Sequence, residues 1–258
     1  MNKEFLTTRP LSFSSLKEFH KSPKHYIAYL TKKWKQTPDM LVGSALHCKL
    51  LEPEKYSDRY AVAPECDKRG IECKSLWAKF AIANEGKDLI TQDQQVLVDA
   101  MLQAVKTNAP AWELFNQIGQ TEAKKEGVIA GLPFVGYIDA LGDDILIDLK
   151  SCQSSSPREF MRDAYNNLYH LQAAIYHKLT GVKDIYFIAV EKSEPYNVTT
   201  FRLNADDNIH GENLLAHLTD QFNLCMDLKQ FDKGYEFHSV NKYEAFQLPK
   251  YAQIEYAL

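Results

Sequence analysis

The chain contains the segment Gly136-Tyr-Ile-Asp139-Ala-Leu-Gly142-Asp-Asp144-Ile-Leu-Ile-Asp148-Leu-Lys150, in which two apolar runs flank a short polar turn. Apolar, β-branched residues on both sides of a glycine-bearing turn predict two consecutive antiparallel strands. Charged residues are rare inside buried strands unless they are paired or bind a metal. Asp139, Asp148 and Lys150 are therefore the candidate functional residues of this segment.

A two-residue loop at Gly142-Asp143 sets the expected register of the hairpin, because glycine suits the first central position of such a turn. Asp139 then stands opposite Leu146 and shares its face with Asp148 and Lys150. In this register the two carboxylates are diagonal neighbours about 7–8 Å apart, close enough to lean toward one cation. A loop of three residues would break the arrangement.

Two carboxylates and an ammonium on one sheet face favour metal-assisted hydrolysis of a phosphodiester. Carboxylates supply the hard oxygen ligands that Mg²⁺ prefers, and the ion keeps positions for water and for phosphate oxygens. The metal lowers the pKa of a bound water, and the neighbouring lysine can orient that water or stabilise developing charge. The Asp-x-Lys pattern alone is common, so a surface strand whose Asp148 and Lys150 face solvent is the alternative.

Helices precede the hairpin, and a helix, two strands and a helix follow it. This order predicts the α/β class with a mixed central sheet. Helices are expected from Leu16 to Leu30 with a break near Pro23, over Val42–Leu51, around Leu76 to Phe80, after Thr91, over Tyr165–Leu179 and over about 206–231; strands are expected over Val128–Ala130, Phe134–Leu141, Ile145–Leu149, Ile185–Val190 and Val198–Leu203.

The composition is that of an ordinary globular protein: of 258 residues, 45% are hydrophobic and 25% charged. No apolar run approaches the roughly 18–20 residues that span a bilayer, and the start Met1-Asn-Lys-Glu-Phe5 does not resemble a secretory signal. The net charge of −4 does not indicate nucleic-acid binding, although several lysines lie between Lys21 and Lys35. We expect a cytoplasmic protein without membrane association.

The five cysteines are irregularly spaced, and no Cys-x-x-Cys motif occurs. An odd count with this spacing argues against a disulfide framework and against a structural zinc site. Free and mostly buried thiols are expected, which suits a reducing compartment.

Beyond these residues, the chain resembles the PD-(D/E)xK nucleases, in particular the RecE and lambda exonuclease branch of phage recombination enzymes. In that family an Asp ends one strand and D/E-x-K ends the next, as Asp139 and Asp148-Leu149-Lys150 do here. The resemblance runs from about Leu11 to Val190 and implies a restriction-endonuclease-like core. Other matching stretches are Leu11-Ser-Phe-Ser-Ser-Leu16, Ser22-Pro-Lys-His-Tyr26, Gly43-Ser-Ala-Leu-His47, Leu50-Leu-Glu-Pro-Glu-Lys-Tyr56 and the pair Gln172 and Tyr176.

The resemblance also implies further ligands for the metal. His47 would complete the metal site, although a histidine on an apolar helix is more often an ordinary core residue. Glu122 lies where relatives carry another acidic residue, and Glu126 competes with it for that position. The backbone carbonyl of Leu149 is a further expected ligand.

Gln172 and Tyr176 are four residues apart, so they face the same way on a helix. Their role in the family would be to support Lys150 or to contact a phosphate, and ordinary helix packing is the alternative. The catalytic set expected by resemblance thus comprises Asp139, Asp148, Lys150, Glu122, Gln172 and Tyr176, and the metal set comprises His47, Asp139, Asp148 and Leu149.

The function implied by the resemblance is Mg²⁺-dependent resection of linear double-stranded DNA ends, from 5′ to 3′, leaving 3′ single strands for an annealing partner. Mn²⁺ would substitute for Mg²⁺, and the enzyme would form a ring-shaped homo-oligomer in the cytoplasm of a bacterial host. We expect one domain over 1–258, with a helical region at about 11–118 and the nuclease core at about 119–231. A RecB-like single-strand nuclease, an endonuclease and a non-catalytic DNA-binding scaffold are the alternatives.

Overall fold

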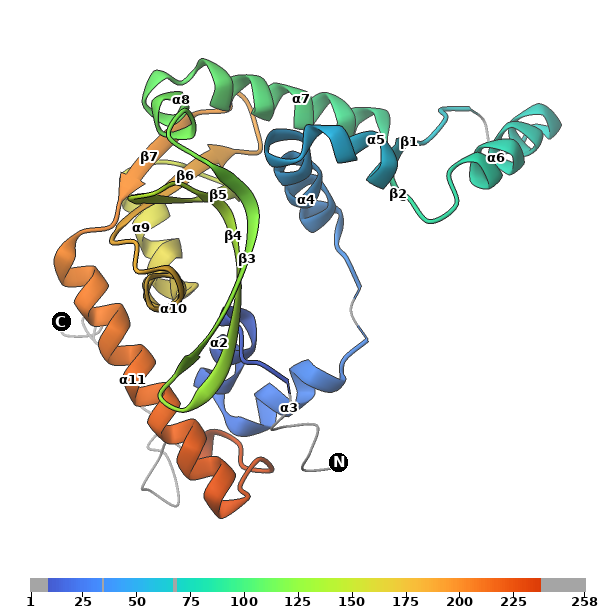
Figure 1. Ribbon diagram of the computed structural model, residues 1–258. Helices are drawn as coiled ribbons and strands as arrows, with labels where there is room; N and C mark the ends of the chain where they lie inside the picture. Colours follow the sequence, from blue (N-terminus) through green and yellow to red (C-terminus); the bar gives the residue numbers. More distant parts are fainter. Residues whose placement is uncertain (1–8, 34, 67–68, 238–258) are drawn as a thin grey trace, which may run out of the picture.

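The computed structural model describes residues 9–33, 35–66 and 69–237 (Figure 1). The ends of the expected single domain, residues 1–8 and 238–258, therefore lie outside the described part. The central sheet has the order β3-β4-β5-β6-β7, with β5 and β6 parallel and the other neighbours antiparallel. Its strands are β3 (Gln120–Ile129), β4 (Leu132–Leu141), β5 (Ile145–Cys152), β6 (Asp184–Glu191) and β7 (Val198–Arg202). The predicted mixed α/β class is confirmed.

Helices surround this sheet, and a small parallel pair, β1 (Tyr60–Val62) and β2 (Asp88–Ile90), lies outside it. Within the described ranges, no helix is long and apolar enough to cross a membrane. The helices are α2 (Phe13–Lys21), α3 (Pro23–Thr31), α4 (Pro38–Leu51), α5 (Tyr56–Arg59), α6 (Ile71–Ala83), α7 (Gln92–Thr107), α8 (Ala109–Phe115), α9 (Pro157–Asn166), α10 (Tyr169–Thr180) and α11 (Ala205–Leu228), with 3₁₀ turns at Pro53–Lys55 and Tyr235–Phe237.

Side-chain caps begin several of the helices. Ser12 and Thr91 form capping boxes at α2 and α7, and the Ser22 hydroxyl accepts from the His25 amide at the start of α3. The single helix expected over Tyr165–Leu179 is wrong, because Leu168 has a left-handed backbone (φ 59°) that separates α9 from α10. A helix cannot continue through such a residue.

Each face of the sheet is buried by a different set of helices. On one face α2, α3, α10 and α11 pack against side chains that include Phe134, Ile138 and Leu146. On the other face α4, α7 and α8 pack against side chains that include Ile147 and Leu149. Strand β5, which carries Asp148, thus lies between the two helical layers (Figure 1).

The expected register of the hairpin is wrong by two residues. Leu141 pairs with Leu146, so a four-residue loop replaces the predicted loop Gly142-Asp143. Gly142 donates its N–H to the Ile145 carbonyl at 2.9 Å, and a Cβ on Gly142 would lie 2.5 Å from the Gln117 carbonyl oxygen. Glycine is required here by this close approach of backbone. A shift of two residues keeps the parity of the strand, but it removes Leu146 from the position opposite Asp139.

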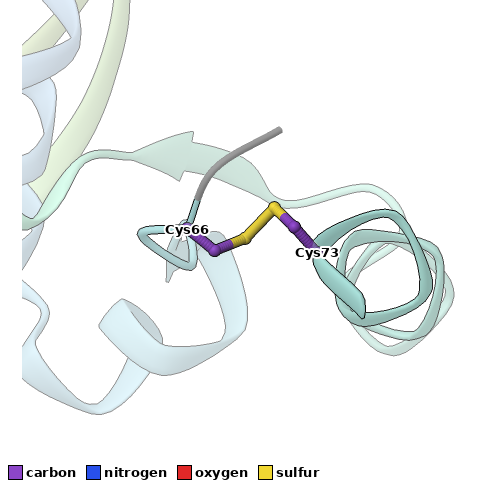
Figure 2. The surroundings of a disulfide bond; sticks show 2 residues. All are labelled: Cys66 and Cys73. Carbon is purple, nitrogen blue, oxygen red and sulfur yellow. A yellow bond between two sulfur atoms is a disulfide. The ribbon is translucent and has the colours of Figure 1, made fainter. Parts of the chain in front are cut away.

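The expectation of free cysteines is wrong for one pair, since Cys66 and Cys73 form a disulfide (Figure 2). Their Cα atoms lie 5.7 Å apart, within bridging range. The count and spacing of cysteines carry no information about such a close approach. The remaining cysteines are free as expected, with Cys48 and Cys225 buried and Cys152 partly exposed.

Candidate active site

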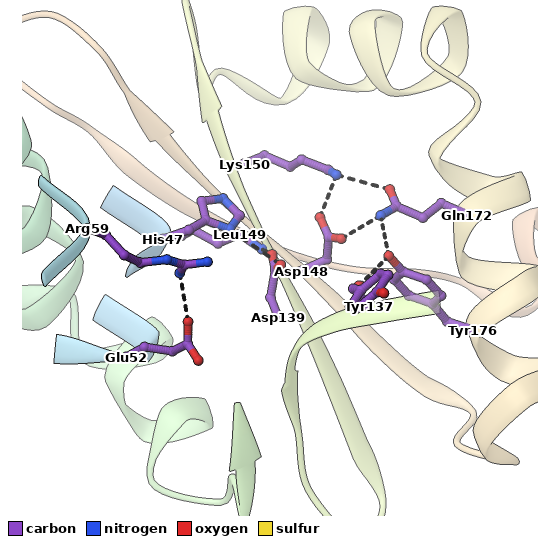
Figure 3. Close-up of polar contacts among 10 residues, drawn as sticks. All are labelled: His47, Glu52, Arg59, Tyr137, Asp139, Asp148, Leu149, Lys150, Gln172 and Tyr176. Atoms are coloured by element: carbon purple, nitrogen blue, oxygen red, sulfur yellow. Dashed lines mark hydrogen bonds and ion pairs between the residues drawn. The ribbon is translucent and has the colours of Figure 1, made fainter. Parts of the chain in front are cut away.

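Asp139 fixes the end of β4 against both β5 and α4. Its Oδ2 accepts a hydrogen bond from the Leu149 backbone N–H at 2.7 Å, and its Oδ1 lies 3.4 Å from His47 Nδ1 (Figure 3). The carboxylate thereby binds a backbone donor of β5 next to Ala140 and Ile147, where the pairing of β4 with β5 ends. Burial raises the pKa of Asp139, but the nearby His47 and Lys150 outweigh it, so that the pKa lies below its usual value.

His47 extends from α4 toward this carboxylate. Burial lowers its pKa, but the charge and hydrogen bond of Asp139 more than reverse this and raise the pKa to about 9. The raised pKa favours the protonated imidazole, and binding a cation through it requires loss of that proton. His47 is therefore not an ordinary core histidine, because its partner is a carboxylate of the candidate site.

Glu122 enters the same site through a strained backbone. Its neighbours pair as Thr121 with Ala140 and Ala123 with Ile138, which leaves Glu122 across from Asp139. The φ angle of Glu122 is 48°, a left-handed conformation that costs a residue with a Cβ about 1–2 kcal/mol. Strain of this kind gathers at functional sites. Burial, followed by repulsion from Asp139, raises the pKa of the Glu122 carboxyl.

Glu126, which competed with Glu122 in the sequence, lies elsewhere. Its carboxylate is 2.6 Å from Lys124 Nζ on the exposed surface of β3. The structure therefore brings Glu122, and not Glu126, to Asp139 and His47.

The ligand atoms of His47, Glu122 and Asp139 all lie within 4.8 Å of one another, the one such group of three among the residues that the structure describes. Ligands of Mg²⁺ bind at about 2.0–2.1 Å in octahedral geometry, so donors on one ion lie about 3 Å apart when adjacent and about 4 Å apart when opposite. Small side-chain movements would bring these three donors to such spacings, and the residues fit a divalent cation. They open onto a cavity of about 430 Å³, whose wall includes His47, Arg59, Tyr60, Asp88, Glu122 and Asp139.

Asp148 and Lys150 form a second group, directed toward α10. Lys150 Nζ lies 2.6 Å from Asp148 Oδ2 and donates to Gln172 Oε1 at 3.0 Å (Figure 3). Gln172 donates in turn to Asp148 Oδ1 at 2.7 Å and to the Tyr176 hydroxyl at 3.0 Å, and that hydroxyl donates to the Tyr137 carbonyl at 2.7 Å. Gln172 and Tyr176 therefore share one helix face, as predicted, and hold the acid and the lysine in place.

The electrostatics of this group keep Lys150 charged. Burial lowers the pKa of Lys150, but Asp148, Tyr169 and Asp139 together raise it above its usual value. Burial raises the pKa of Asp148 to about 6, with Lys150 lowering it and Asp139 raising it. These neighbours favour Lys150 as a donor of hydrogen bonds and positive charge.

Asp139 and Asp148 meet different partners here, and their sharing of one cation stays a prediction. Asp139 groups with His47 and Glu122, whereas the buried Asp148 is neutralised by Lys150. A carboxylate removed from water needs such a partner, and the ammonium supplies it. Leu149 lies between the two groups, with its N–H on Asp139.

Two residues of the site escaped the sequence argument. Lys150 Nζ lies 4.4 Å from the centre of the Tyr169 ring, a cation–π contact. Tyr169 precedes Gln172 by three residues, so the helix-face argument that found Tyr176 could have included it. Arg59 in the cavity wall carries no such signal, because its short helix has no recognisable motif.

Residues 12–234 match a family model described as a PDDEXK-like domain of unknown function (DUF3799). No match was found among curated proteins.

Several solved structures are similar to this chain. One is a "Putative exonuclease" from Eubacterium rectale, with 12% identity, a TM-score of 0.63, and coverage of 99% of this chain and 96% of that one. An alkaline exonuclease (LHK-Exo) from Laribacter hongkongensis has 13% identity and a TM-score of 0.38, covering 89% and 96%. A phage related exonuclease from Haemophilus somnus 129PT has 14% identity and a TM-score of 0.35, covering 87% and 100%. The first of these likenesses shows that the two chains share a fold.

Proposed function

Because this chain belongs to the family of PDDEXK-like domains, we propose that it is a Mg²⁺-dependent exodeoxyribonuclease that degrades linear double-stranded DNA from its ends. The observation that carries the proposal is the meeting of His47, Glu122 and Asp139 beside a charged lysine. A cation-binding group next to a fixed ammonium suits attack on a phosphodiester, where negative charge grows in the transition state.

His47, Glu122 and Asp139 would hold the metal, with Asp148 and the Leu149 carbonyl as the further ligands that the family resemblance implies. The bound ion would supply an activated water and neutralise phosphate charge. Lys150 would donate a hydrogen bond to a phosphate oxygen.

Gln172 and Tyr176 are positioning residues in this proposal. Gln172 contacts both Lys150 and Asp148, and Tyr176 ties Gln172 to the backbone of β4. They would keep the ammonium and the carboxylate at a fixed separation, which limits reorganisation during the reaction.

The finer assignment rests on the resemblance to the RecE and lambda exonuclease branch. We propose 5′-to-3′ resection that leaves 3′ single strands for an annealing protein, by a ring-shaped homo-oligomer in the cytoplasm of a bacterial host. Mn²⁺ would replace Mg²⁺. We further propose a single domain, because one buried cluster joins helical residues from Val42 to Ala111 with strand residues from Ala140 to Val190.

The test incubates purified protein with linear and closed-circular double-stranded DNA, in Mg²⁺, in Mn²⁺ and in EDTA. Lys150→Ala removes the ammonium, and Lys178→Ala is the matched control, since Lys178 pairs with Glu212 away from the site. We expect the wild type and the Lys178→Ala control to degrade linear DNA but not circular DNA, and to do so only when a metal is present. Labelling either strand end then gives the polarity.

Other outcomes would replace the proposal. Cutting of circular DNA would indicate an endonuclease, and consumption of single strands alone would indicate a RecB-like nuclease. Binding without cleavage by both the wild type and Lys150→Ala would indicate a non-catalytic scaffold.

A further inference from the structure

We propose that Arg59 binds a phosphate of the DNA strand that is cut, and that Glu52 holds the Arg59 guanidinium in position to do so. The inference rests on the proposed nuclease function and adds a substrate-binding residue to it. Arg59 lies in α5, outside every motif that pointed to the site.

Arg59 shares a cavity with the residues that would hold the metal. The guanidinium lines the same space of about 430 Å³ as His47, Glu122 and Asp139. In Figure 3 the side chain extends from the α5 side toward His47 and Asp139, while Lys150 and Gln172 lie on the opposite side of Asp139. Arg59 and Lys150 therefore flank the candidate metal group from two directions.

The position of the guanidinium is set by a buried carboxylate. Arg59 Nη1 lies 2.9 Å from Glu52 Oε2, and the Glu52 side chain is 11% exposed, whereas that of Arg59 is 55% exposed. A guanidinium has five N–H donors, and Glu52 accepts from one of its terminal nitrogens. Cys48 is a second partner of the guanidinium, and the donors on its exposed side can meet a ligand while Glu52 holds its other side.

The carboxylates of the cavity would repel a polyanion such as DNA, and a cation at the position of Arg59 offsets that repulsion. Its described wall contains the carboxylates of Asp88, Glu122 and Asp139, and Arg59 is the one lysine or arginine among the wall residues that the structure describes. Phosphate would be repelled by the carboxylates alone. A planar guanidinium can bind two oxygens of a phosphate at once, which a lysine ammonium cannot do.

The experiment compares Arg59→Ala, Arg59→Lys and Glu52→Gln with the wild type. Arg202→Ala is the matched control, because Arg202 is also exposed and paired with a carboxylate, Asp184, but lies outside the cavity. Equilibrium binding to a short linear duplex is measured in EDTA over a range of salt concentrations. Cleavage kinetics in Mg²⁺ give kcat and KM.

Loss of one phosphate contact predicts a slope of log affinity against log salt that is smaller by roughly one unit in Arg59→Ala. We expect kcat/KM to fall about 10- to 100-fold in that variant, the range for losing a hydrogen bond to a charged group. Arg59→Lys should keep the wild-type slope but recover part of the rate, and Glu52→Gln should raise KM. Arg202→Ala should match the wild type in every measurement.

A neutral linkage in the DNA identifies the phosphate. Duplexes carrying a single methylphosphonate at successive positions from the end are bound by the wild type and by Arg59→Ala. At one position the methylphosphonate should weaken binding of the duplex to the wild type. It should leave binding to Arg59→Ala unchanged, because that variant already lacks the phosphate contact.

An active wild type whose Arg59→Ala variant keeps the same slope, kcat and KM would overturn this inference and leave the proposed function intact. A wild type that neither binds nor cuts DNA would overturn both. If Arg59→Ala fails to fold, Arg59→Lys decides, since full recovery of kcat and KM by lysine would refute bidentate binding.

Discussion

Replacing Gln172 by leucine should destabilise the protein and remove its activity together. Gln172 is 6% exposed and makes hydrogen bonds with Asp148, Lys150 and the Tyr176 hydroxyl. Leucine has a similar volume but no polar atoms, so these buried groups lose their partner while the packing is roughly preserved.

The size of the effect follows from the two charged partners. Each hydrogen bond to a charged group contributes about 1.5–3 kcal/mol, and burying leucine in place of the amide returns about 1.5–2 kcal/mol. We expect the free energy of unfolding to fall by about 1–4 kcal/mol. For a chain of this size, 1 kcal/mol shifts Tm by about 2–4 °C, so Tm should fall by about 2–16 °C.

The assay is thermal unfolding by circular dichroism in EDTA, followed by DNA cleavage in Mg²⁺ at a temperature where the variant is folded. Gln95→Leu is the control, because Gln95 also hydrogen-bonds a tyrosine (Tyr56) and a carboxylate (Asp99), but on the partly exposed surface of α7. Its Tm should change by about 2 °C or less. A Gln172→Leu variant that melts with the wild type and cuts DNA at the wild-type rate would refute the network as drawn.

Further predictions concern strain, packing and the metal. Glu122→Gly should raise the free energy of unfolding by about 1 kcal/mol in EDTA, because glycine accepts the positive φ of 48°, yet should abolish cleavage; an unchanged melting curve would count against strain at this position. Gly211→Ala should destabilise the protein by at least about 1–3 kcal/mol in denaturant unfolding, since the new Cβ would lie 2.2 Å from the His170 carbonyl oxygen between α11 and α10; wild-type stability would contradict this packing. Adding Mg²⁺ at 100 times its Kd should stabilise the wild type by about 2.7 kcal/mol in calorimetry, and EDTA should reverse the effect. The Asp139→Asn variant should not be stabilised, and equal stabilisation of this variant would refute Asp139 as a ligand.

Part of the site is encoded over short distances along the chain. The β-branched runs around the turn at Gly142 predicted the two strands, and the charges of Asp139, Asp148 and Lys150 inside them marked the functional segment. The spacing of Gln172 and Tyr176 predicted a shared helix face, because side chains four residues apart are neighbours on any helix.

The tertiary structure alone determined the rest. The register of the hairpin depends on the contact of Gly142 with Gln117, and the selection of Glu122 over Glu126 depends on a strained turn of β3. The division of the carboxylates arises because α4 presents His47 to Asp139, whereas α10 presents Gln172 to Asp148.

The physical reason is the range of the interactions. Alternation and helical spacing are properties of neighbouring residues, so a sequence displays them directly. Partners such as His47 and Asp139, or Arg59 and the cavity it lines, are separated by many residues and meet only after the helices have packed on the sheet. The carboxylates that they meet there outweigh the effect of burial on their pKa. The ionisation of Lys150 and His47 therefore belongs to the folded protein and cannot be predicted from their place in the sequence.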